Sequence, residues 1–276
     1  MKRLDGKVVV ITGAASGIGR ALALESARRG GLLALSDIDS PGLQQTADLV
    51  KEASGQEVRV DKLDVRDREA WKEYAASVVA DFGKVNVVVN NAGVALTGDV
   101  EKMDYEHLDF VMGVNFWGVV QGTMEFLPHL IASGDGHLVN ISSLFGLMAV
   151  PGQSAYNASK FGVRGFTEAL RQEMVLAGRP VTVTAVHPGG IKTAIARNAR
   201  AVGVDQAEHA NFFDQKLAKT TPEKAAEVIL DGMLAGKPRV LVGTDAKVLD
   251  ALVRVTGPGY QKLVSRVVGR TIGRDR

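Results

Sequence analysis

The sequence reads Val8-Val9-Val10-Ile11-Thr12-Gly13-Ala14-Ala15-Ser16-Gly17-Ile18-Gly19 near its start, where an apolar run leads into a glycine-rich loop. Because Val8–Ile11 has no polar alternation, it predicts a strand buried on both faces, as in a parallel sheet covered by helices. Gly17–Arg29 is typical of the helix that follows such a strand. The glycines permit a sharp turn, and the helix N-terminus offers unpaired N–H groups to a pyrophosphate. The loop predicts either a phosphate-binding site or a structural turn.

Apolar runs and longer helical stretches continue to alternate along the chain. Six further strands are expected, at Leu32–Leu35, Val58–Val60, Val85–Val89, His137–Ile141, Val181–Val186 and Arg239–Val242. Helices are expected over Asp104–Ala132, with a bend near Pro128, over Ala155–Ala177, and after the start signal Thr221-Pro222-Glu223. Right-handed crossovers then give an α/β, single-domain, Rossmann-type doubly wound parallel sheet with helices on both faces.

The length of 276 residues suits one large domain, without a linker or repeat. We expect a single domain over 1–276, with a substrate lid at about 192–220 and a C-terminal extension at 244–276. The 33 basic and 31 acidic residues do not indicate a nucleic-acid partner. The lack of cysteine excludes disulfides and thiolate chemistry, and the five histidines show no metal-ligand spacing.

We expect a cytoplasmic protein without an integral membrane segment, because no signal peptide and no apolar run of ~18 residues occur. The tail carries basic residues that we interpret as a solvated face, with a membrane-surface role as the alternative. They are Lys262, Arg266, Arg270, Arg274 and Arg276.

Two carboxylates follow predicted strands at the edge where a dinucleotide would bind. Asp37 lies ~20 residues past the glycines, where a carboxylate can accept hydrogen bonds from the adenosine ribose and repel a 2′-phosphate. Since no basic residue in the sequence stands beside it, Asp37 favours NAD over NADP. The alternative is a solvated turn residue. Asp64 has two interpretations, adenine contact or helix cap, and the contact is slightly favoured.

Tyr156 and Lys160 stand four residues apart and so share one face of the predicted helix. A nearby ammonium lowers the pKa of a phenol, so Tyr156 could act as general acid or base on an alcohol oxygen. Ser143 ends the fifth strand, and its hydroxyl could hold the substrate oxygen. Ser142 is the competitor, but strand alternation points the two side chains in opposite directions.

Asn115 lies in the long predicted helix between apolar neighbours, where a polar amide must find hydrogen-bond partners. One interpretation is a structural buried asparagine. The other is a kinked helix whose backbone carbonyl holds a proton-relay water.

Taken together, these segments resemble the short-chain dehydrogenase/reductase family. Four segments occur in the order typical of that family. They are the cofactor loop Thr12–Gly19, the Asn90-Asn91-Ala92-Gly93 segment, the tetrad Asn115, Ser143, Tyr156 and Lys160, and Pro188-Gly189 with Ile191 and Thr193. The resemblance covers about residues 5–195. It implies a seven-stranded sheet of order 3-2-1-4-5-6-7 and a homodimer or homotetramer. The expected cofactor-binding residues are Gly13, Ser16, Gly17, Ile18, Gly19, Asp37, Asp64, Val65, Asn91, Gly93, Tyr156, Lys160, Pro188, Gly189, Ile191 and Thr193.

The expected activity is NAD-dependent hydride transfer between a secondary alcohol and a ketone. A small apolar substrate is indicated by apolar residues after Ser143 and by Phe212 and Phe213 in the lid segment. Two alternatives stay open: an NADPH-dependent 3-oxoacyl-carrier reductase, which Asp37 disfavours, and a non-catalytic NAD-binding sensor, which has no need of a Tyr–Lys pair.

Overall fold

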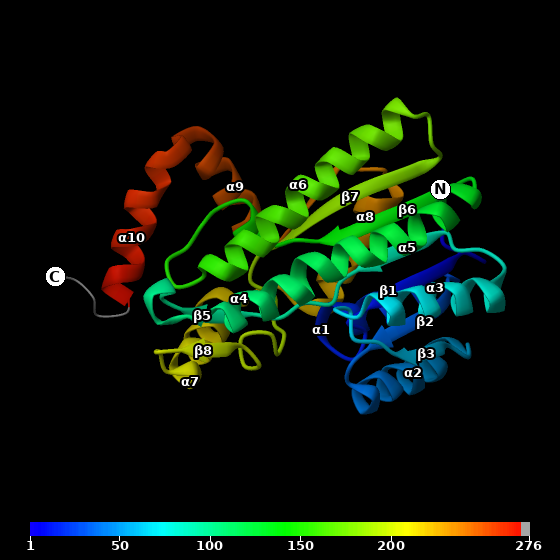
Figure 1. The fold of residues 1–276 in the computed structure, drawn as a ribbon, viewed down its shortest axis with the longest axis horizontal. Coiled ribbons are helices and arrows are strands. Elements are labelled where there is room, and N and C mark those ends of the chain that lie inside the picture. The colour runs from blue at the N-terminus through cyan, green and yellow to red at the C-terminus, as the bar shows by residue number, and fades with distance from the viewer. Residues whose placement is uncertain (272–276) are drawn as a thin grey trace.

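The structure, a computed structural model, describes residues 1–271 and is built on a seven-stranded parallel sheet (Figure 1). Its strands are β1 (Val8–Thr12), β2 (Leu32–Asp37), β3 (Arg59–Lys62), β4 (Val87–Asn90), β6 (Gly136–Ile141), β7 (Val181–Pro188) and β9 (Arg239–Val242). They lie in the order β3-β2-β1-β4-β6-β7-β9. Numbered by their place in the sheet, these strands confirm the predicted order 3-2-1-4-5-6-7 and the Rossmann-type fold.

Both faces of the sheet are covered by helices. Along β1, Val9 and Ile11 pack into one hydrophobic core with α1 and α8, whereas Val8 and Val10 pack into a second core with α3, α5 and α6. Successive side chains of a strand point to opposite faces, so a continuous apolar run serves both cores. The helices are α1 (Gly17–Arg28), α2 (Ser40–Ser54), α3 (Arg68–Phe82), α4 (Tyr105–Met112), α5 (Gly118–Ala132), α6 (Ser154–Leu176), α7 (Gln206–Phe212), α8 (Pro222–Leu234), α9 (Thr244–Thr256) and α10 (Tyr260–Thr271).

Local sequence signals set several helix ends. Thr221 caps α8 by accepting a hydrogen bond from Lys224 N at 3.2 Å, and Pro222 takes the first helical position, as the sequence predicted. Gly55 and Gly83 end α2 and α3 with positive φ angles of 71° and 72°. Such a left-handed residue is the common C-terminal stop of a helix.

The long helix predicted over Asp104–Ala132 is wrong in detail. A π-helical turn at Gly113–Trp117 separates α4 from α5, and Pro128 lies inside α5. The interruption therefore falls at Asn115 and not at Pro128, because the Asn115 side chain is drawn into tertiary hydrogen bonds. A short second sheet, β5 (Leu96–Gly98) with β8 (Arg200–Val202), also went unpredicted, since three-residue strands carry almost no periodicity.

The segment 192–220 is more regular than expected, because it contains β8, α7 and a π-helical turn at Phe213–Leu217. The C-terminal extension forms a helical hairpin of α9, a 3₁₀ turn at Gly257–Gly259, and α10, which stands away from the sheet (Figure 1). Of the basic tail, Lys262 and Arg266 are exposed on α10, and Arg274 and Arg276 lie outside the described residues. Within residues 1–271, no helix has the length and apolarity required to cross a membrane.

Candidate active site

A large cavity of about 1400 Å³ runs past the carboxyl ends of β1, β2, β4, β6 and β7 to the α9–α10 hairpin. Ligands of open parallel sheets bind at this edge. The structure brings all the predicted site residues to the cavity wall except Gly19 and Asn115, which lie behind it. Residues as distant in sequence as Asp37 and Thr193 thereby border one space.

The glycine loop at one end of the cavity requires its glycines. Gly13 has a φ of 66°, and a Cβ there would stand 2.7 Å from Ala92 Cα. A Cβ on Gly19 would come within 2.0 Å of Gly13 O. Ser16 precedes α1, and its exposed hydroxyl makes no capping hydrogen bond. The loop thus presents backbone and one hydroxyl, together with the N-terminus of α1, to the cavity.

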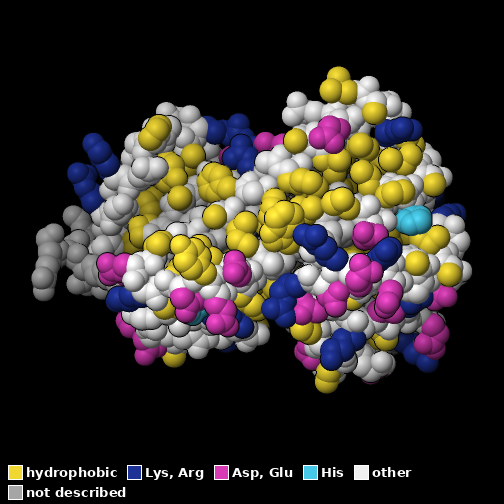
Figure 2. Space-filling model, in the orientation of Figure 1, with side chains coloured by type: hydrophobic (Ala, Val, Ile, Leu, Met, Phe, Trp, Pro, Cys, Tyr) yellow, Lys and Arg dark blue, Asp and Glu magenta, His cyan; other side chains and the backbone are white. Residues whose placement is uncertain are grey.

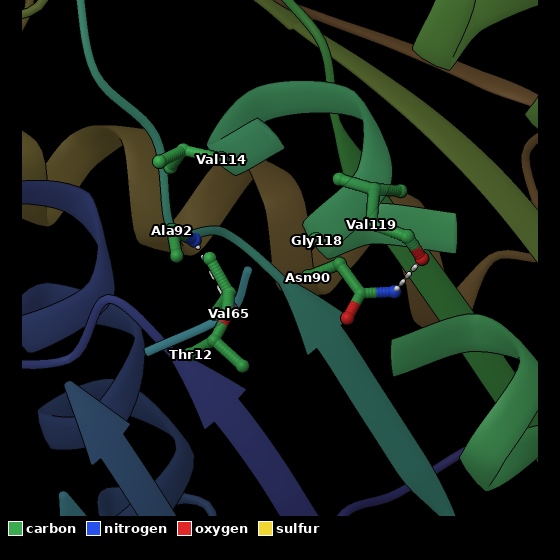
Figure 3. Close-up of a pocket in the computed structure, with 7 residues that line it drawn as sticks. All are labelled: Thr12, Val65, Asn90, Ala92, Val114, Gly118 and Val119. Carbon is green, nitrogen blue, oxygen red and sulfur yellow. Dashed lines mark hydrogen bonds between the residues drawn. The ribbon is translucent and has the colours of Figure 1, made fainter. Parts of the chain in front are cut away.

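The Asn90-Asn91-Ala92-Gly93 segment braces the loop from the neighbouring strand. Asn91 Nδ2 donates to Thr12 O at 2.9 Å and Gly13 O at 3.1 Å, and Thr12 Oγ1 accepts from Ala92 N at 3.0 Å. Asn90 points the other way and donates to Val119 O at 3.4 Å, beside a small crevice (Figure 3). The two asparagines therefore join β4 to the glycine loop and to α5.

Asp37 ends β2 at the cavity wall. Its Oδ2 accepts from Ala15 N at 2.9 Å and its Oδ1 from Asp39 N at 3.0 Å, so the carboxylate is fixed by the glycine loop. The sequence shows no basic residue beside Asp37, but the sheet register pairs it with exposed Lys62 of β3. This neighbour could be identified only after the strand pairing was known.

Asp64 and Val65 also line the cavity. The Asp64 carboxylate binds Arg66 Nη2 at 2.6 Å, and this hydrogen bond holds the pKa of Asp64 below its usual value. Asp64 does not cap the following helix, because Asp67 does so by accepting from Glu69 N and Ala70 N. Val65 packs against Gly118, where a Cβ would stand 2.8 Å from Val65 Cγ2. The helix-cap interpretation of Asp64 was wrong.

Ser143, Tyr156 and Lys160 meet in the middle of the cavity wall. Ser143 follows β6, and its hydroxyl shares a hydrogen bond with the Tyr156 phenol. Lys160 Nζ lies 5.7 Å from the centre of the Tyr156 ring and donates to Ile141 O at 3.1 Å. A helical spacing of four residues places Tyr156 and Lys160 on the same side of α6.

Burial governs the acid–base properties of these groups. It raises the pKa of Tyr156, and the hydrogen bond from Ser143 offsets this in part. Burial also lowers the pKa of Lys160 to about 8. The sequence led us to expect a lowered Tyr156 pKa from the nearby ammonium. The direction in the structure is the opposite, because desolvation disfavours the charged form of both buried groups.

The two serines at the end of β6 have different partners. Ser142 is buried and donates to Lys160 O at 2.8 Å, whereas Ser143 Oγ accepts from Phe145 N at 3.1 Å and bonds with Tyr156. Sequence reasoning missed His187, a buried residue of β7 whose Nδ1 donates to Ser143 O at 2.9 Å. A histidine inside a strand gives no signal of such a contact until the strands are paired.

Asn115 is fully buried in the π-helical turn. Its Oδ1 accepts from Val94 N at 2.8 Å, and its Nδ2 donates to Val94 O at 2.9 Å and Ser159 Oγ at 3.1 Å. These three hydrogen bonds join the turn to the segment after β4 and to α6. Gly93 fits between Asn115 and Lys160, because a Cβ there would lie 3.3 Å from Asn115 Oδ1 and 3.4 Å from Lys160 Nζ.

Pro188, Gly189, Ile191 and Thr193 form the wall beyond β7. A Cβ on Gly17 would lie 3.1 Å from Thr193 Cγ2, so this segment faces the glycine loop. Asp245 of α9, which sequence reasoning missed, accepts from Gly190 N at 2.7 Å. This hydrogen bond joins the hairpin to the wall although the two residues are 55 positions apart in the sequence, so no local pattern could reveal it.

Comparisons with known proteins agree with this architecture. Residues 7–202 match the family model described as short chain dehydrogenase. A Mycobacterium tuberculosis (strain ATCC 25618 / H37Rv) protein named "Putative oxidoreductase SadH" is 58% identical over 271 residues, covering 98% of both chains. The 3-oxoacyl-[acyl-carrier-protein] reductase FabG of Thermotoga maritima is 40% identical over 234 residues, which cover 83% of this chain and 90% of FabG.

Among solved structures, a short chain dehydrogenase/reductase from Burkholderia phymatum in complex with NAD superposes with a TM-score of 0.87. It is 30% identical, and the match covers 93% of this chain and 95% of that one. The sheet order, the glycine loop and the matched segments agree with the sequence resemblance. The chain therefore belongs to the short-chain dehydrogenase/reductase family of oxidoreductases.

Proposed function

We propose that this protein is an NAD-dependent oxidoreductase that interconverts an apolar secondary alcohol and its ketone. The observation that carries the proposal is the meeting of Ser143, Tyr156 and Lys160 in the cavity that also holds the glycine loop and Asp37. Hydride transfer at a carbon–oxygen bond needs a proton-transfer group, a hydroxyl that binds the oxygen and a dinucleotide site in one space, and this cavity combines the three.

The cavity fits a nicotinamide dinucleotide. Gly13 and Gly19 allow the loop to pack closely, because a Cβ at either position would clash with neighbouring backbone, and Ser16 with the N-terminus of α1 would hold the pyrophosphate. Ile18 lines the space beside them, while Asp64, Val65 and Asn91 would border the adenosine. Gly93 and Lys160 would contact the nicotinamide ribose. The segment formed by Pro188, Gly189, Ile191 and Thr193 would hold the nicotinamide.

The proposed mechanism assigns the proton to Tyr156. The bound cofactor supplies the hydride acceptor in oxidation and the hydride donor in reduction. Ser143 donates a hydrogen bond to the substrate oxygen and positions its carbon. During oxidation the hydroxyl proton passes to a Tyr156 phenolate as the carbon loses hydride, which leaves a ketone; reduction returns the proton. Lys160 stabilises that phenolate, and Asn115 holds the turn beside which a water chain would reach solvent.

NAD preference is proposed from Asp37. A carboxylate has about four acceptor sites, and two backbone N–H groups occupy only part of them. The remaining acceptor sites of Asp37 can bind ribose hydroxyls, and its negative charge would repel a 2′-phosphate. Among the described residues, Arg66 is the basic residue that lines this end of the cavity, and it is paired with Asp64; Lys62, which pairs with Asp37 in the sheet, does not line the cavity. Titration calorimetry should therefore give tighter binding of NADH than NADPH, and Asp37→Ser should reduce the difference. A clear NADPH preference would refute the assignment.

The activity is tested by a spectrophotometric NADH screen over secondary alcohols and ketones, repeated with Tyr156→Phe. Removing the phenol should lower kcat by about 10²–10⁴-fold, because a general acid–base group contributes that much. NADH affinity should stay near the wild-type value. Full activity in the variant would contradict the role of Tyr156, and an inactive wild type that binds NADH would favour the sensor alternative.

A carrier-linked 3-oxoacyl substrate is the second candidate, favoured by the similarity to FabG of Thermotoga maritima. Asp37 weighs against it if that activity depends on NADPH. A 3-oxoacyl thioester tested with NADH and NADPH separates the two candidates.

We also propose a homo-oligomer formed through α5, α6 and the π-helical turn, where large apolar side chains are exposed (Figure 2). Trp117, Met124 and Phe161 are 45%, 64% and 39% exposed. Contiguous apolar surface of this kind marks protein interfaces. Light scattering should give a dimer or tetramer that Trp117→Glu with Phe161→Glu dissociates; a monomeric wild type would contradict this.

A further inference from the structure

The far end of the cavity is formed by the α9–α10 hairpin, and its lining is apolar. The described hairpin residues that border the space, apart from Thr244 and Asp245 at the start of α9, are Val248, Leu249, Leu252, Leu263, Val264, Val267 and Val268. They recur every three or four residues, so one face of each helix is turned toward the cavity. The charged residues Lys262 and Arg266 lie outside this stripe.

Part of this stripe is left in contact with water. Leu263 is 50% exposed and Val267 is 55% exposed, although both border the cavity. Figure 2 shows hydrophobic side chains gathered in the hollow between the hairpin and the body of the molecule. Apolar surface gains about 25 cal/mol per Å² when it is removed from water. The stripe therefore has a favourable free energy of contact with an apolar ligand.

The hairpin is attached to the loop that carries Ser143. Tyr260, the first residue of α10, is buried and its Oη accepts from Ala149 N at 2.9 Å. Tyr260 packs with Leu144 and Met148, which follow Ser143 in sequence. The apolar lining is thus continuous from the proposed reacting groups to the tip of the hairpin.

The opposite wall, formed by the 192–220 segment, also contributes apolar side chains, although Asp205, Glu208 and Lys219 line the cavity from the same segment. Phe212, Phe213 and Leu217 border the cavity from the 192–220 segment. The Phe145 ring lies 6.2 Å from the Tyr156 ring in an edge-to-face arrangement. A ligand that reaches Tyr156 and extends away from the cofactor end therefore lies between apolar side chains of both walls.

We infer that the α9–α10 hairpin is the binding wall for an extended hydrocarbon chain of the substrate, whose hydroxyl or keto group lies at Ser143 and Tyr156. The inference rests on the proposed function for the identity of that reacting group. The occupant is a substrate chain because the apolar wall opens directly onto the reacting groups. The cavity of about 1400 Å³ exceeds the ~300–1,000 Å³ of most ligand sites, and it extends from the residues proposed to hold the cofactor to the hairpin.

The test is a series of secondary alcohols of about four to about twelve carbon atoms, bound to the full chain with saturating NADH so that oxidation is blocked. Calorimetry should show affinity rising by up to about fourfold per added methylene, the equivalent of about 0.8 kcal/mol. Leu263→Gln with Val267→Gln should flatten this dependence. The matched control is Val255→Gln on α9, which is 86% exposed, does not line the cavity and should leave the dependence as in wild type.

Turnover of the same alcohols with NAD⁺ is measured separately. Chain-length-dependent binding without turnover would uphold the apolar wall and refute the proposed oxidoreduction. Turnover with an affinity that does not change with chain length would uphold the oxidoreduction and refute the wall. An unchanged slope in the Leu263 and Val267 double variant, with its circular dichroism intact, would also overturn the inference.

Discussion

Replacing Asn115 by leucine separates its structural role from its proposed part in proton transfer. Leucine has the same number of side-chain heavy atoms, although it is bulkier, and it has no polar group, so the three hydrogen bonds to Val94 and Ser159 are lost. Each intramolecular hydrogen bond contributes about 1 kcal/mol net, which gives about 3 kcal/mol of destabilisation. At roughly 2–4 °C per kcal/mol for a domain near this size, Tm should fall by roughly 6–12 °C.

The assay is urea and thermal unfolding followed by circular dichroism, with kcat measured well below the Tm of the variant. Asn211→Leu is the matched control, because Asn211 is exposed on α7 and should change stability by no more than about 0.5 kcal/mol. If Asn115→Leu unfolds within about 0.5 kcal/mol of wild type, the side chain does not hold the π-helical turn and our reasoning is refuted. If the variant is destabilised but has the kcat of the wild type, Asn115 holds the π-helical turn but takes no part in proton transfer.

Two further predictions concern buried titratable groups. Burial lowers the pKa of Lys160 from 10.5 to about 8, so the unfolded chain binds the extra proton between these values and folding becomes more favourable as pH rises through that window. The free energy of unfolding of the wild type, measured by urea titration relative to that of Lys160→Met, should increase by about 3 kcal/mol from pH 8 to 10.5. If the difference between the two proteins does not change with pH, the lowered pKa of Lys160 is contradicted. Burial likewise lowers the pKa of His187 from 6.5 to about 4. The unfolded chain therefore binds more protons in this window, and the free energy of unfolding should decrease as the pH is lowered from 6.5 to 4. His187→Phe should reduce this acid sensitivity without abolishing it, because burial also lowers the pKa of His137 to about 4. It should lower kcat more than it changes KM, because Ser143 loses its support; an unaltered acid limb and kcat would exclude both effects.

The sequence predicted the sheet well, because its central strands β1, β4 and β6 are buried on both faces and therefore appear as continuous apolar runs. Val8–Ile11 and Arg239–Val242 agree with β1 and β9 to within one residue. The three-residue strands β5 and β8 could not be predicted in this way, since each is too short to show a period. A kink at Asn115 was one of two interpretations of the sequence, but the π-helical turn itself could not be predicted, because it arises from hydrogen bonds between Asn115 and residues of other elements.

The sequence also identified most of the cavity wall, since the glycine loop, Ser143, Tyr156 and Lys160 follow strand ends or helical spacing. Neighbours that come from strand pairing or helix docking left no such pattern. Lys62 beside Asp37, His187 behind Ser143 and Asp245 on Gly190 are of this kind.

Local sequence thus determined which residues form most strands and helices and the glycine loop, because hydrophobic period and glycine geometry act over a few residues. Only the tertiary structure decided the direction of the pKa shifts of Tyr156 and Lys160 and which residues enclose these side chains. Desolvation of Tyr156 and Lys160 depends on everything packed around them, and it reversed the expected direction of the Tyr156 pKa. The placement of α10 against the loop after Ser143 depends on the Tyr260–Ala149 hydrogen bond across 111 residues. Such long-range contacts are specified by the whole fold, and no window of sequence contains them.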